Sequence, residues 1–140
     1  MDTINVMLDE GAKMPTRGHA DDAGFDLYTP TKQVVPARGC VAIDTGVHME
    51  IPKGYVGEVE TKSGLNMKHS IVALGGIIDA GYTGPIVVKV YNMSDVDYTF
   101  EAGDKIVQLV IQTCVTPTAV EVTSFDETER GNDGFGSTGR

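Results

Sequence analysis

Alternation of apolar and polar residues with a period of two is the sequence feature that most narrows the possible folds. It runs through residues 4–8, 41–51 and 107–111. In a strand, successive side chains point to opposite faces, so the pattern predicts strands with one buried face. Glycine and proline recur between the runs and indicate many tight turns. The sequence therefore predicts an all-β fold, either a sandwich, a jelly roll or a barrel. The alternating apolar residues are Ile4, Val6, Leu8, Val41, Ile43, Val47, Met49, Ile51, Val107, Leu109 and Ile111.

One passage is predicted to be helical. Residues Ser63–His69 tolerate a helix, and a serine can cap its first turn. A length of 140 residues suits one domain with a substantial core and leaves little room for a second. We therefore expect one β domain with at most one short helix.

The formal charge of −9 argues against direct nucleic-acid binding, since proteins that bind a phosphate backbone normally present a basic patch. The apolar stretches are also shorter than the roughly 20 residues that cross a membrane. The acidic, alternating start of the chain differs from a secretory signal. We expect a soluble, cytoplasmic protein without membrane partners, in which Cys40 and Cys114 are buried free thiols.

The composition changes after Phe125. Residues 126–140 read DETERGNDGFGSTGR and contain no aliphatic side chain, so this segment cannot bury enough apolar surface to order itself. We therefore divide the chain into a β domain, residues 1–125, and a flexible glycine-rich segment, residues 126–140. A solvated terminus without a role is the alternative for this segment.

One aromatic residue favours a role for the glycine-rich segment. Phe135 lies between two glycines, the second of which is Gly136, and glycine frees the backbone to lay the ring against a ligand. Arg130, Ser137 and Thr138 add donors for an anion. A ligand that contains both a base and phosphates would suit this set.

A second informative segment is GGIIDAGYTGP, Gly75–Pro85. An apolar pair leads into Asp79, which is followed by a tight Ala80–Gly81 turn and Tyr82. Such a turn places a carboxylate and an aromatic ring at one site. The alternative is a plain hairpin whose aspartate bonds its own backbone, which is common beside glycine.

Three further segments place polar residues in unusual positions. In AGFDLY, Ala23–Tyr28, Asp26 interrupts an apolar run and needs a partner or a metal, because burying an unpaired carboxylate is costly. In TKSGL, Thr61–Leu65, a cation, a hydroxyl and a glycine precede the predicted helix and suit a phosphate cradle. In GDKIVQLV, Gly103–Val110, Gln108 lies among apolar neighbours, and a satisfied strand glutamine is the alternative to a ligand contact.

These five segments, in this order, resemble the five sequence motifs of the trimeric dUTPase family, the deoxyuridine 5'-triphosphate nucleotidohydrolases. AGFDLY is similar to the first motif, KSGL to the second, GIIDAGYTG to the third, GDKIVQL to the fourth and RGNDGFGSTG to the fifth. The stretch GVHMEIPKGYVGEV resembles the family's lead-in. The resemblance runs from about Ala20 to Arg140. It implies a distorted jelly-roll or β-barrel-like subunit that forms a homotrimer, with each active site built from all three chains.

The resemblance also implies hydrolysis of dUTP to dUMP and pyrophosphate, which limits uracil incorporation into DNA and supplies dUMP for thymidylate synthesis. Asp79 would be the general base for the water that attacks the α-phosphorus. Tyr82 would pack against the deoxyribose and exclude a 2′-hydroxyl. The hairpin at Gly76, Ile77 and Ile78 would read the uracil edge and exclude the methyl group of thymine.

The other motifs would hold the phosphates and the metal. Asp26 would hold Mg²⁺ on the triphosphate through water, and the fifth motif would close over the nucleotide with Phe135 stacked on uracil. The residues implied to bind the rest of the substrate are Lys62, Ser63, Gly64 and Gln108, together with Arg130, Gly136, Ser137 and Thr138 of the fifth motif.

Three positions depart from the usual family pattern. Lys62 stands where arginine is usual, so a point charge replaces a bidentate fork. Thr83 replaces a frequent arginine after the tyrosine, and Asp133 adds a negative charge where glycine is common.

Two alternatives to dUTP hydrolysis stay open. The dCTP deaminases share the fold and a similar hairpin, but they have a catalytic glutamate ten positions beyond the hairpin aspartate, where this chain has Lys89. The other alternative is a regulatory protein on the dUTPase fold that uses nucleotide binding as a switch. Lys89 and the glycine-rich segment argue against a deaminase, and the intact Asp79 argues that hydrolysis persists beside any regulatory role.

Overall fold

The strands that the alternation predicts are short and numerous. The computed structural model describes residues 2–139. Its elements are β1 (Val6–Leu8), β2 (Gly24–Tyr28), β3 (Gln33–Val35), β4 (Cys40–Asp44), β5 (Val47–Met49), β6 (Tyr55–Glu60), α1 (Ser63–His69), β7 (Ile71–Ala73), β8 (Ile77–Ile78), β9 (Val87–Asn92), β10 (Tyr98–Phe100) and β11 (Lys105–Thr113).

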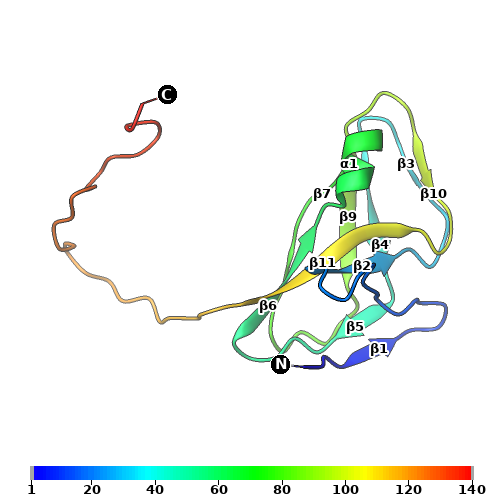
Figure 1. The fold of residues 1–140 in the computed structure, drawn as a ribbon, viewed down its shortest axis with the longest axis horizontal. Coiled ribbons are helices and arrows are strands. Elements are labelled where there is room, and N and C mark those ends of the chain that lie inside the picture. The colour runs from blue at the N-terminus through cyan, green and yellow to red at the C-terminus, as the bar shows by residue number, and fades with distance from the viewer. Residues whose placement is uncertain (1, 140) are drawn as a thin grey trace.

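The strands form one body with α1 near one end and the C-terminal segment extending away from it (Figure 1). A four-stranded antiparallel sheet has the order β2-β11-β6-β8, and a three-stranded sheet has the order β4-β9-β7. Two further pairs, β1-β5 and β10-β3, are also antiparallel. The predicted all-β, jelly-roll-like fold with one short helix is confirmed.

The core lies between the sheets and follows from the alternation. In β11, Val107 and Leu109 are fully buried, and in β9 Val88 and Val90 point inward while Lys89 points outward. Each fully buried aliphatic side chain contributes roughly 1.5–3 kcal/mol relative to an exposed one. The largest fully buried side chains are Phe100, Leu27, Ile43, Met49, Ile51, Ile71, Ile86, Ile106 and Leu109.

The helix covers the predicted residues, but its start differs from the expectation. Lys62, in an extended conformation, is the N-cap residue, and no side chain caps the first turn. Ser63 is therefore the first helical residue rather than the cap. At the other end, Ser70 adopts a left-handed conformation with φ of 55°, and its N–H donates to the carbonyl of Asn66 at 3.0 Å.

Two expectations about individual residues are wrong. Cys40 is exposed and Cys114 is half-buried, although both are free thiols as predicted. In β4, Ile43 points into the core, and Cys40 lies on the opposite face because side chains alternate. The strand ends also differ, since Ile4 and Ile51 lie outside β1 and β5, although Ile51 is buried.

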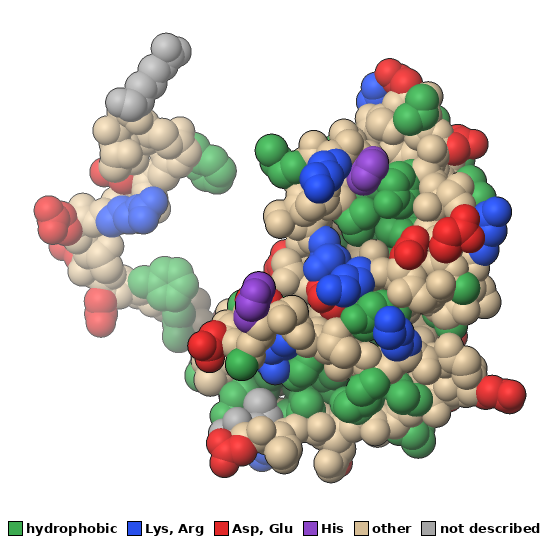
Figure 2. Space-filling view, turned by 45° about the vertical axis from the view of Figure 1, so that its right-hand side comes forward, with side chains coloured by type: hydrophobic (Ala, Val, Ile, Leu, Met, Phe, Trp, Pro, Cys, Tyr) green, Lys and Arg blue, Asp and Glu red, His purple; other side chains and the backbone are tan. Residues whose placement is uncertain are grey.

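The chain beyond β11 leaves the sheets. After Thr113, residues 114–139 form neither strand nor helix. Figure 2 shows this segment standing clear of the body with hydrophobic side chains uncovered. Phe125 is 91% exposed, and Phe135 is also fully exposed. Within residues 2–139, no helix has the length and apolar character needed to cross a membrane.

Candidate active site

Asp26, in the middle of β2, is the buried carboxylate of the site, with a side chain 9% exposed. Lys62 Nζ donates to its Oδ1, and Lys105 Nζ lies 2.9 Å from its Oδ2. Burial alone would raise the pKa of Asp26, but the hydrogen bonds and charges of Lys105 and Lys62 outweigh it and hold the pKa below the ordinary value. We call these three residues the lysine cluster. Because the carboxylate is ionised, the cluster has a net charge of about +1 at neutral pH.

Gln108 lies beside the lysine cluster because of strand register. On β11 it is directly opposite Asp26 on β2 and Glu60 on β6. Its Nε2 donates to the carbonyl of Thr61 at 3.0 Å, while a β-carbon at Gly24 would lie 2.5 Å from its Oε1. The Gln108 side chain therefore occupies the space that a side chain at position 24 would fill. One N–H of the Gln108 amide is used by Thr61, and the amide nitrogen has a second N–H that can donate to a phosphate oxygen.

The predicted phosphate cradle follows Thr61 at the start of α1. Lys62 belongs to the lysine cluster, and Ser63 and Gly64 are exposed in the first helical turn. The Thr61 hydroxyl accepts from the N–H of Ala73 at 2.9 Å and so connects this start to β7. The fold thus brings Lys62, Ser63 and Gly64 to the end of β6.

The hairpin with the predicted base is attached to the same sheet. On β8, Ile78 pairs with Gly57 of β6 and Ile77 pairs with Glu58. The next residue, Asp79, is exposed. Among the described residues, the Asp79 carboxylate has no protein hydrogen bond, so the structure lacks the self-bonded arrangement of a plain Asp-Gly turn. Its carboxylate is free to accept from water or a ligand.

Tyr82 is held by the loop that follows Asp79, residues 79–85, which we call the hairpin loop. Its N–H donates to the Asp79 carbonyl at 3.1 Å, which closes the predicted Ala80–Gly81 turn. Its hydroxyl donates to the carbonyl of Pro85 at 2.9 Å. A β-carbon on Gly84 would lie 2.4 Å from the Tyr82 hydroxyl oxygen, so the ring lies directly across that glycine.

His48 connects the hairpin loop to the rest of the body. Its Nδ1 is 2.7 Å from the carbonyl oxygen of Thr83, and its Nε2 is 3.0 Å from Oδ1 of Asp9. The pKa of His48 is raised by the bond to Thr83, against a smaller opposite effect of lost hydration, and Asp9 adds to the rise. The loop leaves at Ile86, whose N–H donates to the Val47 carbonyl at 2.8 Å.

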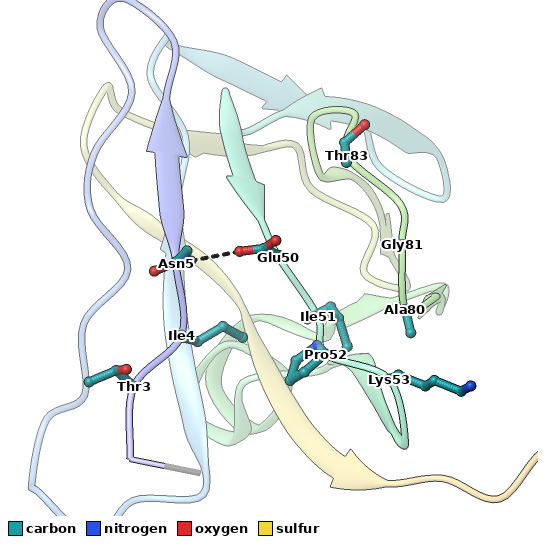
Figure 3. Close-up of a pocket in the computed structure, with 10 residues that line it drawn as sticks. All are labelled: Thr3, Ile4, Asn5, Glu50, Ile51, Pro52, Lys53, Ala80, Gly81 and Thr83. Atoms are coloured by element: carbon teal, nitrogen blue, oxygen red, sulfur yellow. Dashed lines mark hydrogen bonds between the residues drawn. The ribbon is translucent and has the colours of Figure 1, made fainter.

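A groove of about 620 Å³ runs beside the hairpin loop. Figure 3 shows Ala80, Gly81 and Thr83 on one side, and residues 3–5 and 50–53 facing them. Asn5 donates from Nδ2 to Oε2 of Glu50 at 2.6 Å along this groove. The groove leaves one side of the hairpin loop accessible. Neither Lys62 nor Gln108 lines it, so the groove is separate from the lysine cluster.

The predicted substrate-binding residues of the glycine-rich segment do not lie near the lysine cluster or the hairpin loop. Phe135, with φ of 49°, is fully exposed. The C-terminal segment to which it belongs extends away from the body (Figure 1). The hydrogen bonds described for this segment form local turns. Arg130 Nε donates to the Asp133 carbonyl at 2.9 Å, and the Ser137 N–H donates to the Gly134 carbonyl at 3.1 Å. The candidate site of one chain therefore lacks these donors.

Four positions of the site were not among the predicted site residues. Lys105 and Gly24 lie inside the fourth and first motifs, and their neighbours Asp26 and Gln108 were the only signal for them. Gly84 follows the predicted tyrosine by two positions. His48 offered no sequence signal, because its partners at positions 9 and 83 are remote along the chain.

The two parts of the site lie on one sheet. The lysine cluster and Gln108 are on β2, β11 and the end of β6, while the exposed carboxylate and the aromatic ring follow β8, at the edge of the same sheet. Lysines and amides suit a phosphorylated ligand, and the exposed carboxylate suits the activation of water. Fold and site define an all-β protein built to act on a phosphorylated ligand.

Comparisons with known proteins narrow this class to one family. A sequence model of the dUTPase family matches residues 10–139. The probable deoxyuridine 5'-triphosphate nucleotidohydrolase of Schizosaccharomyces pombe is 46% identical over 132 residues, which cover 94% of each chain. The deoxyuridine 5'-triphosphate nucleotidohydrolase of Arabidopsis thaliana is 47% identical over 132 residues, 94% of this chain and 80% of that one. The chain belongs to the dUTPase family.

Solved structures agree with this assignment. The Staphylococcus bacteriophage 80alpha dUTPase with dUPNHPP superposes with a TM-score of 0.94 at 32% identity, over 100% of both chains. A mutant dUTPase of phage phi11 of S. aureus superposes with a TM-score of 0.82 at 32% identity, over 89% of this chain and 99% of that one. The phi11 structure reveals the coordination of a structural Mg(II) ion.

Proposed function

We propose that this chain hydrolyses dUTP to dUMP and pyrophosphate. The main support from the site is Asp79, an exposed carboxylate without a protein hydrogen bond among the described residues, on the same sheet as a lysine cluster. The named relatives are deoxyuridine 5'-triphosphate nucleotidohydrolases, and the 80alpha dUTPase is solved with dUPNHPP. Such a reaction would limit uracil in DNA and supply dUMP for thymidylate synthesis.

In this proposal the hairpin recognises the nucleoside. Because β8 is an edge strand, the backbone groups of Gly76, Ile77 and Ile78 that do not pair with β6 are open to the edge of a uracil base. Tyr82, fixed by its bond to Pro85, packs against the deoxyribose and leaves no room for a 2′-hydroxyl.

The chemical step then depends on Asp79. Its carboxylate accepts a proton from the water that attacks the α-phosphorus, and pyrophosphate leaves on the opposite side. Phosphoryl transfer depends mainly on positioning and on neutralised charge. Lys62 supplies a cation, Ser63 and Gly64 supply donors at the start of α1, and Gln108 contacts the α-phosphate.

The donor set fits Mg²⁺ held through water. Both carboxylate oxygens of Asp26 already accept from lysines, yet each oxygen keeps a second lone pair for a metal-bound water. Among residues 2–139, no three His, Cys, Asp or Glu side chains gather as direct ligands. Mg²⁺ keeps several waters and binds substrate phosphates, so Asp26 would hold it in the outer shell. When bound, it neutralises charge on the triphosphate.

The proposal includes a homotrimer in which the glycine-rich segment, residues 126–140, acts as a lid on a neighbouring subunit. Phe135 would stack on uracil, and Gly136 would let the segment turn around the ring. Arg130, Ser137 and Thr138 would hold the distal phosphates. Support comes from the extension of the segment away from its own body, which leaves the site of one chain without these donors (Figure 1).

We place this activity in the cytoplasm, with free dUTP rather than nucleic acid as the ligand. Two free thiols agree with a reducing compartment, and the charge of −9 disfavours binding to a phosphate backbone. The deaminase alternative is disfavoured by Lys89, which occupies an exposed position on β9. A regulatory role, in which nucleotide binding acts as a switch, would be an addition to hydrolysis.

The test is pyrophosphate release from dUTP, dCTP, dTTP and UTP by the wild type and by Asp79→Asn. We expect fast release from dUTP alone and a loss of at least about a thousandfold in Asp79→Asn, since base and water positioning are lost together. Asp21→Asn, in an exposed loop, is the matched control and should keep full activity. A wild type that leaves dUTP intact would refute the proposal.

A further inference from the structure

We propose that His48 is a positioning residue that holds the hairpin loop in place through a doubly protonated imidazole ring. The inference rests on the proposed function, because the loop includes Asp79 and Tyr82. It adds a pH-dependent attachment to the site, through a side chain that does not touch the substrate.

The protonation state follows from the partners of the ring. Nδ1 is 2.7 Å from the carbonyl oxygen of Thr83, and Nε2 is 3.0 Å from Oδ1 of Asp9. A carbonyl and a carboxylate only accept hydrogen bonds, so each ring nitrogen must donate. A neutral imidazole has one N–H and satisfies one of these contacts. The two contacts therefore favour the imidazolium form.

The surroundings favour the positive charge. The side chain of His48 is 15% exposed, and Asp9 and Asp44 are the charged groups that act on it. Glu50 and His48 line one shallow pocket, but the Glu50 carboxylate accepts a hydrogen bond from Asn5 rather than from His48. The bond to Thr83 is the largest cause of the raised pKa of His48, with desolvation opposing it and Asp9 and Asp44 adding to it. Geometry and charge thus point in the same direction.

The hairpin loop depends on this contact. The bonds of Tyr82 to Asp79 and to Pro85 are internal to the loop. Among the described residues, the His48 bond to Thr83 is the one side-chain hydrogen bond that ties the loop to the body. Without it, the loop is held at β8 and again only at Ile86. Release of Thr83 would therefore loosen the placement of Asp79.

Loss of one proton is expected to break the Thr83 contact rather than the Asp9 contact. The Thr83 contact is the shorter of the two, but Asp9 carries a full negative charge, and hydrogen bonds to a carboxylate are stronger than those to a neutral carbonyl. We therefore expect the remaining proton to stay on Nε2. The Nδ1 lone pair then faces the Thr83 carbonyl and repels it. Because the folded pKa is raised above the ordinary 6.5, the attachment is complete below pH 6.5 and is lost as the pH rises through the raised value.

Asp9→Asn gives the sharpest test, because it should remove the pH dependence without removing the attachment. An asparagine amide donates to Nε2, so a neutral His48 with its proton on Nδ1 satisfies both contacts. We expect Asp9→Asn to match the wild type at low pH. As the pH rises through the His48 pKa, the wild-type kcat/KM on dUTP should fall about tenfold relative to Asp9→Asn.

Two further measurements complete the test. His48→Gln should lower kcat/KM about tenfold below the His48 transition and match the wild type above it, whereas His19→Gln, 89% exposed, should behave as the wild type at every pH. NMR of the imidazole nitrogens in the full-length protein should show both protonated below the transition. This measurement needs no substrate, so it stays decisive even if the chain does not hydrolyse dUTP. A ring with a single proton, or a pH-independent ratio of wild type to Asp9→Asn, would overturn the proposal.

Discussion

Lys105 Nζ lies 2.9 Å from Oδ2 of Asp26, although Lys105 pairs with Tyr28 in the register between β11 and β2. Asp26 and Tyr28 are two residues apart and point to the same face of β2, so the lysine reaches along that face. A register irregularity between Lys105 and Val107 accompanies this arrangement. The lysine at the start of the strand thereby helps to keep the buried carboxylate ionised.

Lys105→Met should make folding less dependent on pH. In the folded protein the pKa of Asp26 is lowered from its ordinary 3.8 and that of Lys105 is raised from its ordinary 10.5. The stability that this pair contributes is therefore complete between pH 3.8 and pH 10.5. It is lost as pH falls through the folded Asp26 value or rises through the folded Lys105 value. We expect urea unfolding to show a less stable variant at neutral pH and convergence with the wild type in acid.

Lys32→Met is the control for that experiment, because Lys32 is exposed and takes no part in the lysine cluster. It should follow the wild-type stability curve. Equal stability of Lys105→Met and the wild type at every pH would contradict the interpretation of the pair.

Gly24→Ala should disturb Gln108 directly. The new β-carbon would lie 2.5 Å from Oε1 and 2.9 Å from Cβ of Gln108, and the latter atom cannot swing away. We expect a loss of about 1–3 kcal/mol in the free energy of unfolding from overpacking, together with reduced turnover of dUTP. In the double variant Gly24→Ala/Gln108→Ala, stability should partly recover while turnover stays low. Identical stability of the two variants would contradict this contact.

Part of the fold could be predicted from the sequence, because side-chain alternation and helix tolerance depend on residues that are close together along the chain. Alternation predicted β1, β4, β5 and β11, and the helix-tolerant run after Lys62 matches α1 residue for residue. The same alternation also predicts that Cys40 is exposed, because a core-facing Ile43 places Cys40 on the outer face. Strand ends at Ile4 and Ile51 could not be predicted, because hydrogen-bond pairing, rather than burial, decides where a strand stops.

The contacts between motifs could not be predicted in the same way. That Asp26 faces Gln108 and accepts from Lys105 depends on strand register, which tertiary packing determines. The Asp26 carboxylate was expected to need a partner or a metal, and the fold supplies two lysines. His48 illustrates the limit, because its role depends on a backbone carbonyl, which has no sequence signal.

Gly84→Ala should weaken the discrimination between dUTP and UTP. Its β-carbon would lie 2.4 Å from the hydroxyl oxygen of Tyr82 and 2.6 Å from Cζ, so the ring must move away from its bond to Pro85. We expect the ratio of kcat/KM for dUTP to that for UTP to fall on the order of tenfold. Tyr82→Phe loses the bond to Pro85 but keeps the ring above Gly84, so it should lower the ratio less than Gly84→Ala does. An unchanged ratio in Gly84→Ala would mean that ring placement does not exclude the ribose.

Removal of residues 130–140 should abolish most turnover and leave the oligomer intact, because residues 130–139 lie outside the sheets and contribute nothing to the core. Light scattering would give the mass, and pyrophosphate release would give the activity. Full activity of the truncated chain would refute a lid, whereas a monomeric truncated chain would place the segment in the subunit interface instead.

Mixing two inactive variants then tests whether the lid serves a neighbour. The truncated chain keeps Asp79 but has no lid, and full-length Asp79→Asn has a lid but no base. If each site takes its base from one chain and its lid from another, unfolding and refolding an equal mixture should restore roughly a quarter of wild-type sites, since each role is filled correctly about half the time. A lid that closes on its own chain predicts no recovery, because neither variant then has a complete site. Recovery after co-refolding, but not after simple mixing of the folded proteins, would show that the active sites form when the two variants assemble into mixed oligomers.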